Sequence, residues 1–156
     1  MEQKILIAFD ESENALRAAL HVAKFYNTKS NITLLSVIPD LSALYEMSSP
    51  ELTPYFKTQQ SNFLLIQDKK KEVVRDALKK ARAALIEAGF DESKITTKLA
   101  TKQRGIARDI LDEARQGYDL IVLGRRGISG IKEFFLGSVS QKVFSQAKDI
   151  SVLIVN

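Results

Sequence analysis

The chain alternates between short apolar segments and longer segments in which apolar residues recur with helical spacing. Five short segments have the character of β-strands, and four of them are almost wholly apolar, as is typical of parallel strands covered on both faces. The third is more polar and alternating, so we expect it at an edge of the sheet. The predicted strands are 4–9, 31–38, 94–100, 118–123 and 150–155.

Helical patterns fill the intervals between these strands. The first covers about 12–25 behind Ser12, a favoured N-cap residue, and the second covers about 61–88 and ends at Gly89. A third ends at Gly117, and the last covers about 138–146. The apolar stripes are Leu16, Ala19, Leu20 and Ala23 in the first, Val74, Ala77, Leu78, Ala81, Leu85 and Ala88 in the second, and Ala107, Ile110, Leu111 and Ala114 in the third.

Strand–helix alternation predicts an α/β fold with an open, Rossmann-like parallel sheet of five strands. Right-handed crossovers place helices on both faces, and we expect the strand order 3-2-1-4-5. The 156 residues are most simply one domain, 1–156. Residues 39–60 hold all three prolines, so we interpret them as a long, mobile loop insertion with a short helical turn near 41–47.

Composition excludes several classes of function. The chain has no cysteine, which rules out disulfides and thiolate metal ligands. Its net charge is only +4, and the lysines at 69–71 lie between Asp68 and Glu72, so this run is typical of a solvated helix face. No nucleic-acid-binding module, signal-peptide layout or apolar run of membrane-spanning length is present. We therefore expect a cytoplasmic protein with neither a nucleic acid nor a membrane as partner.

The strongest candidate motif is a set of glycines around the fourth strand. Gly124 and Gly127 follow that strand, and Gly137 and Ser138 begin the last helix. Glycines let a backbone approach an anion closely, and a helix N-terminus offers unpaired N–H groups. The first two glycines alone could be only a turn, but a Gly-Ser at a helix start favours phosphate binding. Neither the dinucleotide-binding glycine fingerprint nor the P-loop motif occurs.

Two segments of the chain should meet at one edge of the predicted sheet. Ligands of open α/β sheets bind beyond the carboxyl ends of the strands, where the strand order reverses. The first strand ends at residues 8–12, which include Asp10, and the fourth ends at Gly124. A central first strand brings both ends to that crevice, so the sequence predicts a nucleotide site there.

These motifs resemble the universal stress proteins of the UspA type. ATP-binding members of that family carry G-x2-G-x9-G-[ST], and this chain has Gly124, Gly127, Gly137 and Ser138 at that spacing. The segments 5–12, 118–124 and 136–140 also resemble the family's. The likeness covers essentially the whole chain apart from the variable loop. It implies a fold similar to the adenine nucleotide alpha hydrolases, with ATP as the ligand.

The resemblance also implies a role for each matching residue. The carboxylate of Asp10 would lie beside the ribose and phosphates, and the backbone of Val37 would hydrogen-bond adenine. A magnesium or manganese ion would be carried on the phosphates rather than in a protein cage. The implied contacts are Ala8 and Phe9 at the adenosine end, Asp10, Val37, Gly124, Arg125 and Gly127 around the base, ribose and phosphates, and Gly137, Ser138, Val139 and Ser140 on the phosphates.

Some positions depart from the family pattern or have a simpler interpretation. Glu11 stands where many members have glycine, and Ser36 stands where many have histidine. Arg125 and Arg126 replace smaller residues, and they could pair with phosphate and offset Glu11 or point into water. Asp10 and Ser138 could instead serve only as helix caps.

The sequence favours a regulatory module over an enzyme. The single histidine, His21, lies inside the first predicted helix, so no nucleophile–histidine constellation can form. We expect an ATP-binding stress-response protein with at most slow ATP hydrolysis, read by an unknown protein partner. The alternatives are an interaction scaffold with a vestigial site and a true phosphotransfer or hydrolytic enzyme. The apolar terminal strand, 150–155, predicts a homodimer joined at that edge, as in the family.

Overall fold

The sheet has the predicted architecture. The computed structural model describes residues 2–40, 53–126 and 136–156, and its five strands are parallel in the order β3-β2-β1-β4-β5. The polar third strand lies at one edge and the C-terminal strand at the other, which confirms both expectations. The strands are β1 (Lys4–Ala8), β2 (Asn31–Ile38), β3 (Ile95–Thr101), β4 (Leu120–Gly124) and β5 (Ser151–Val155).

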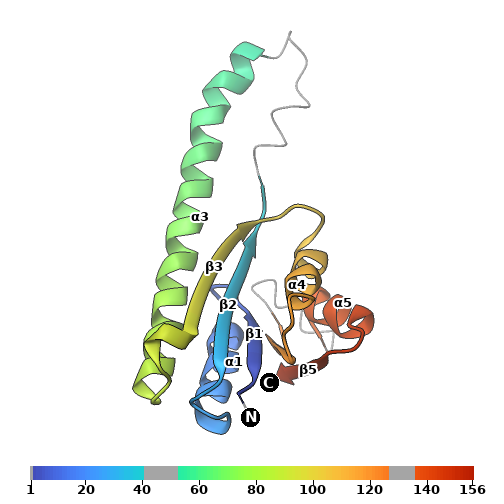
Figure 1. Cartoon of the computed structure of the whole chain (residues 1–156). Helices are drawn as coiled ribbons and strands as arrows, with labels where there is room; N and C mark the ends of the chain where they lie inside the picture. The colour runs from blue at the N-terminus through green and yellow to red at the C-terminus, as the bar shows by residue number, and fades with distance from the viewer. Residues whose placement is uncertain (1, 41–52, 127–135) are drawn as a thin grey trace.

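Helices cover both faces of the sheet, as the crossover rule predicts. Figure 1 shows α3 along one side of the sheet and α4 and α5 on the other. The buried residues of α1 pack with those of α3, which places α1 on the face of α3. The helical elements are α1 (Glu13–Phe25), α3 (Thr53–Glu87), the 3₁₀ turn η2 (Glu92–Lys94), α4 (Ile106–Ala114) and α5 (Ser138–Gln146).

Each face of the sheet has its own apolar core because successive side chains of a strand point to opposite faces. Ile5 and Ile7 of β1 belong to the core under α1 and α3, together with Val22 and Leu85. Leu6, between them, belongs to the core under α4 and α5. All these side chains are excluded from solvent. The central strand is therefore fixed from both sides, and its carboxyl end is held in place.

The long helix begins earlier than the sequence predicted. We expected an irregular segment up to residue 60 and a helix from about Ser61, whereas α3 already begins at Thr53. Pro54 lies in its first turn, where a missing N–H costs nothing because that N–H has no helical partner. The proline that we took as a loop signal is thus compatible with a helix start. The helical turn expected at 41–47 lies outside the described residues.

Two expected stripe positions are wrong. Leu20 is 45% exposed, because the buried face of α1 runs through Ala15, Ala18, Ala19 and Val22 and is offset from it. Ala88 is also exposed, since α3 ends at Glu87 before the chain turns at Gly89. The stripe of the third helix is correct: Ala107, Ile110, Leu111 and Ala114 are all buried in α4.

Candidate functional site

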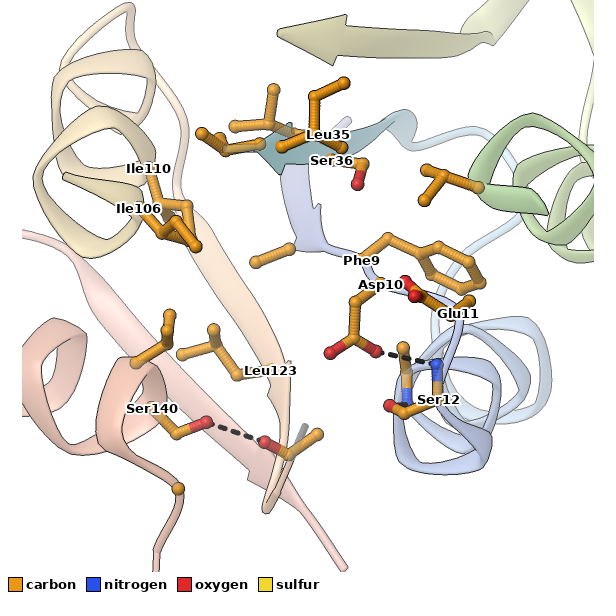
Figure 2. Close-up of a pocket in the computed structure, with 18 of the residues that line it drawn as sticks. Phe9, Asp10, Glu11, Ser12, Leu35, Ser36, Ile106, Ile110, Leu123 and Ser140 are labelled. Carbon is orange, nitrogen blue, oxygen red and sulfur yellow. Dashed lines mark hydrogen bonds between the residues drawn. The ribbon is translucent and has the colours of Figure 1, made fainter. Parts of the chain in front are cut away.

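A cleft of about 350 Å³ lies at the carboxyl ends of β1, β2 and β4. Residues from the ends of these three strands and from the first turns of α1, α4 and α5 line it, as Figure 2 shows. The strand order reverses here, since β2 and β4 flank β1 on opposite sides. The crevice predicted from the sequence is present. The predicted site residues that line it are Ala8, Phe9, Asp10, Val37, Gly124, Gly137, Ser138, Val139 and Ser140.

Asp10 is fixed by the turn that leads into α1. Its Oδ1 accepts a hydrogen bond from the Ser12 backbone N–H at 2.9 Å. The Oγ of Ser12 in turn accepts from the Ala15 N–H at 3.2 Å and caps α1. The cap of this helix is therefore Ser12, and Asp10 is not the cap. The Asp10 carboxylate points into the cleft (Figure 2) and can accept further hydrogen bonds there.

The end of β4 and the start of α5 are tied together. The buried Ser140 Oγ donates to the Gly124 carbonyl at 2.8 Å (Figure 2). The Gly137 N–H donates to the Arg125 carbonyl at 2.9 Å. These two bonds hold the first turn of α5 against the strand end, so Gly124 and Gly137 lie on one wall of the cleft.

Gly124 has a packing role that the sequence did not reveal. A Cβ on this residue would lie 2.7 Å from the backbone carbon and oxygen of Asn14, closer than real Cβ contacts allow. The end of β4 therefore packs directly against the first turn of α1. Glycine is needed here for this backbone approach, whatever else the motif binds.

The N-terminus of α5 opens into the cleft without a capping side chain. Its N-cap is Gly137, which offers no side-chain hydrogen bond, and its first turn contains no acidic residue. Ser138 is the first helical residue, so the interpretation of Ser138 as the cap is wrong. Ser138, Val139 and Ser140 carry the first-turn N–H groups, which have no partner within a helix. The positive end of the helix dipole is left available to an anion.

The other end of the cleft is mostly apolar. Val37 lies at the end of β2, and Ser36 beside it turns its hydroxyl toward the cavity (Figure 2). Opposite them, Ile106 and Ile110 of α4 and Leu123 of β4 form a wall that sequence reasoning did not assign to the site. Their periodicity is that of core residues, so no sequence signal separates a pocket wall from the interior.

The side chains of the two arginines after β4 have different surroundings. Arg126 lines the cleft, whereas Arg125 does not, and the Arg125 guanidinium donates to Asn156 Oδ1 at 3.0 Å. Arg125 contributes its backbone carbonyl, which accepts from Gly137 as described above. Gly127, the remaining predicted site residue, lies outside the described residues.

Glu11 forms a salt bridge with a lysine that we predicted to lie on a solvated helix face. Lys70 of α3 forms a salt bridge with Glu11 Oε1, and both residues line the cleft. The Glu11 side chain is 20% exposed, and no described residue hydrogen-bonds its buried Oε2 atom. Lys69 beside it is exposed, as predicted. Only the docking of α3 brings Lys70 to the β1–α1 turn, so its position in the sequence gave no signal.

A second charged cluster lies at the opposite end of α4. Glu113 accepts from Lys98 Nζ at 2.6 Å and from the Tyr118 hydroxyl at 2.8 Å. Burial acts to raise the pKa of Glu113, but hydrogen bonds from Lys98 and Tyr118 and the charge of Lys98 outweigh it and hold that pKa below its ordinary value. The hydrogen bond with Glu113 raises the pKa of Lys98. This cluster joins β3 to α4 and lies apart from the cleft.

The remaining candidates for chemistry are not in the cleft. His21 lies on α1 with its ring 4.7 Å from that of Phe25, and it does not line the cavity. Among the residues described, no three histidine, aspartate or glutamate side chains come together as metal ligands. Within the same residues, no helix has the length and apolar character needed to span a bilayer.

The model of the universal stress protein family matches residues 1–156. The chain belongs to this family. Universal stress protein YxiE of Bacillus subtilis (strain 168) is 36% identical over 159 residues, which cover 99% of both chains. A relative of this identity and coverage places the whole chain, and not only its motifs, in the family.

Solved universal stress proteins share the fold. UspA from Lactobacillus plantarum is 23% identical with a TM-score of 0.72, covering 99% of this chain and 97% of that one. A universal stress protein solved in complex with cAMP is 20% identical with a TM-score of 0.61 (99% and 97%). A family protein from Arabidopsis thaliana solved with AMP bound is 19% identical with a TM-score of 0.54 (99% and 92%).

Proposed function

We propose that this universal stress protein binds ATP in the cleft and acts as a nucleotide-dependent regulatory module. The observation that carries the proposal is the uncapped N-terminus of α5, which opens into a cleft at the switch point of the sheet. Unpaired N–H groups and a helix dipole with no acidic residue beside it bind phosphate oxygens well. The relatives solved with cAMP and AMP support an adenine nucleotide as the ligand.

The cleft suggests how the nucleotide lies. Its apolar end, with Val37 and the isoleucines of α4, suits the base, and the backbone of Val37 supplies the hydrogen bonds that adenine needs. Asp10 faces the middle of the cleft and accepts from ribose hydroxyls. Ser138, Val139 and Ser140 receive the phosphates, and Arg126 adds a cation to the lining.

We propose that this site does not catalyse efficient ATP hydrolysis. Asp10 and Glu11 are the acidic side chains among the described lining residues, and Glu11 is held by Lys70. Hydrolysis, if present, is slow and relies on water near the terminal phosphate. In this proposal the nucleotide's own phosphates carry Mg²⁺ or Mn²⁺, since Mg²⁺ keeps most of its waters and binds through phosphates and one or two carboxylates.

The nucleotide state would be read by a partner protein, and we propose that the module is a homodimer. β5 is an edge strand, and Val152, Leu153 and Ile154 on it are only partly buried. An exposed apolar edge is stable when it is paired, which a second copy of the chain provides. Light scattering at micromolar concentration should give twice the mass of one chain, and a monomeric mass would refute the dimer.

Calorimetric titration of the purified protein with ATP and Mg²⁺ tests the nucleotide proposal. We expect saturable binding of one ATP per chain, and mass spectrometry of small molecules released by denaturation should detect adenine nucleotide. A folded protein that binds no adenine nucleotide would overturn the proposal. It would favour the alternative of an interaction scaffold with the same fold.

A pair of variants tests the helix terminus itself. Gly137 has an extended backbone, with φ −66° and ψ 158°, that any residue can adopt. Gly137→Asp would cap α5 and place a carboxylate where the phosphates are proposed to bind. We expect ATP affinity to fall at least tenfold more in this variant than in Gly137→Asn, which caps without charge. Equal affinities in the two would contradict phosphate binding at α5.

A further inference from the structure

We propose that Lys70 neutralises Glu11 in the wall of the cleft, and that this neutralisation gives the cleft its preference for phosphate-bearing nucleotides over uncharged nucleosides. The inference rests on the proposed function of the cleft. It assigns a positioning role to a residue of α3, a helix of the cleft wall that carries none of the glycine motif.

Within the described residues, Lys70 is the cation that pairs with Glu11. Lys70 binds Oε1 alone, and the buried Oε2 has no hydrogen-bond donor among the described residues. A carboxylate that is largely removed from water needs compensation, because desolvation penalises an unpaired charge heavily. Without Lys70, the β1–α1 turn would present an uncompensated negative charge to the cavity.

The charges along the cleft show why this pair affects the ligand. The described lining residues carry two acidic side chains, Asp10 and Glu11, and two basic ones, Lys70 and Arg126. The Glu11–Lys70 pair makes the α3 side close to neutral, so the positive N-terminus of α5 can attract phosphates. Removal of the Lys70 charge makes the described part of the lining net negative, which opposes a ligand carrying several negative charges.

Lys70 reaches Glu11 because of where α3 lies. Val74, one helical turn further along α3, is buried in the core and also lines the cleft. Residues at i and i+4 share a helix face, so packing of Val74 directs Lys70 toward the β1–α1 turn. The side chain is about one-third exposed, which leaves the ammonium at the rim of the cavity. The position of α3 and the charge of the cleft are thereby linked.

The test is a mutant cycle titrated with adenosine, AMP and ATP. We expect Lys70→Met to lower affinity for ATP about tenfold, to lower affinity for AMP less, and to leave adenosine unchanged. Glu11→Gln combined with Lys70→Met should restore ATP affinity to near the parent's, because neither charge is then present. Lys70→Arg should keep it. Lys69→Met, which removes an exposed neighbouring charge, is the matched control and should change little.

Each other result overturns the inference in a recognisable way. An equal loss for all three ligands in Lys70→Met would mean that the lysine only docks the helix. A failure of the double variant to recover would mean that Lys70 contacts phosphate itself rather than neutralising Glu11. If the parent protein binds none of the ligands, the proposed function fails and this inference fails with it. Binding by the parent with no effect of Lys70→Met refutes this inference alone.

Discussion

At the scale of single residues, Gly124 serves two requirements at once. It ends β4 at the cleft, and it lets the strand end contact the backbone of Asn14 in α1. Its carbonyl accepts the buried hydroxyl of Ser140. A glycine motif that looks like a ligand-binding signature is therefore also a packing device, and loss of function in a glycine variant does not by itself identify a ligand contact.

Substitution of this glycine should reduce stability even without nucleotide. Gly124→Ala would push a methyl group to within 2.7 Å of the Asn14 backbone, so the strand end or α1 must shift. Overpacking of this kind costs about 1–3 kcal/mol. Urea denaturation of the ligand-free protein measures it, and a loss below about 0.5 kcal/mol would show that the two elements can separate freely.

Two serines near each other on α5 offer a matched comparison. Ser140→Ala removes a buried hydrogen bond and leaves the Gly124 carbonyl without that donor, which should cost about 1–2 kcal/mol. Ser145→Ala removes an exposed bond of 3.2 Å to the Lys142 carbonyl and should stay within about 0.5 kcal/mol of the parent. Chemical denaturation compares them, and equal effects would contradict a structural tie between α5 and β4.

At the scale of elements, charged side chains join strands to helices at both ends of the fold. Lys70 and Glu11 connect α3 to the turn after β1, and Lys98 and Glu113 connect β3 to α4. Glu113 also accepts a hydrogen bond from the hydroxyl of Tyr118, a buried residue just before β4. β3 has only one neighbouring strand, so this contact helps to fix the edge of the sheet against α4.

This second pair predicts a dependence of stability on acid pH. The pKa of Glu113 is lowered in the folded protein, so its carboxylate stabilises the fold above its unfolded pKa, and that contribution is lost as pH falls through the folded value. The parent should exceed Glu113→Gln in free energy of unfolding at neutral pH. The difference should shrink between about pH 5 and pH 3. Denaturation at several pH values measures this, and a constant difference would refute the linkage.

At the scale of the whole molecule, the cleft joins segments that are far apart in the sequence. The turn after β1, the end of β2, a lysine of α3 and the first turns of α4 and α5 all line it. A ligand that contacts all of them stabilises the folded state only, because the unfolded chain has no such cleft. The same arrangement would let a bound nucleotide influence α3, whose N-terminal part extends past the sheet in Figure 1.

Nucleotide should therefore raise the melting temperature of the whole domain. ATP at about one hundred times its dissociation constant adds about 2.7 kcal/mol to the free energy of unfolding. For a chain of this size that corresponds to a rise of about 5–10 °C. Differential scanning calorimetry with increasing ATP measures it, with GTP as a comparison for the base. An unchanged melting temperature at millimolar ATP would contradict the proposed site.

The sequence by itself determined the architecture. Short apolar runs and helical spacing are local properties, so the parallel sheet with helices on both faces could be predicted. The polar alternation of the third strand predicted its edge position, and the strand order 3-2-1-4-5 followed from taking the first strand as central. It also identified the crevice, because the carboxyl ends of parallel strands share one edge. Local signals failed at the start of α3, where Pro54 is compatible with both a loop and a first helical turn.

Only the tertiary structure decided which side chains meet. The approach of Gly124 to Asn14, the choice of Arg126 over Arg125 in the cleft lining, and the salt bridge from Lys70 to Glu11 all depend on how helices pack on the sheet. Such contacts join residues up to 110 positions apart, since 124 minus 14 is 110. Periodicity carries no information about these distances, and only packing places Lys70, predicted to lie on a solvated helix face, in the lining of the cleft.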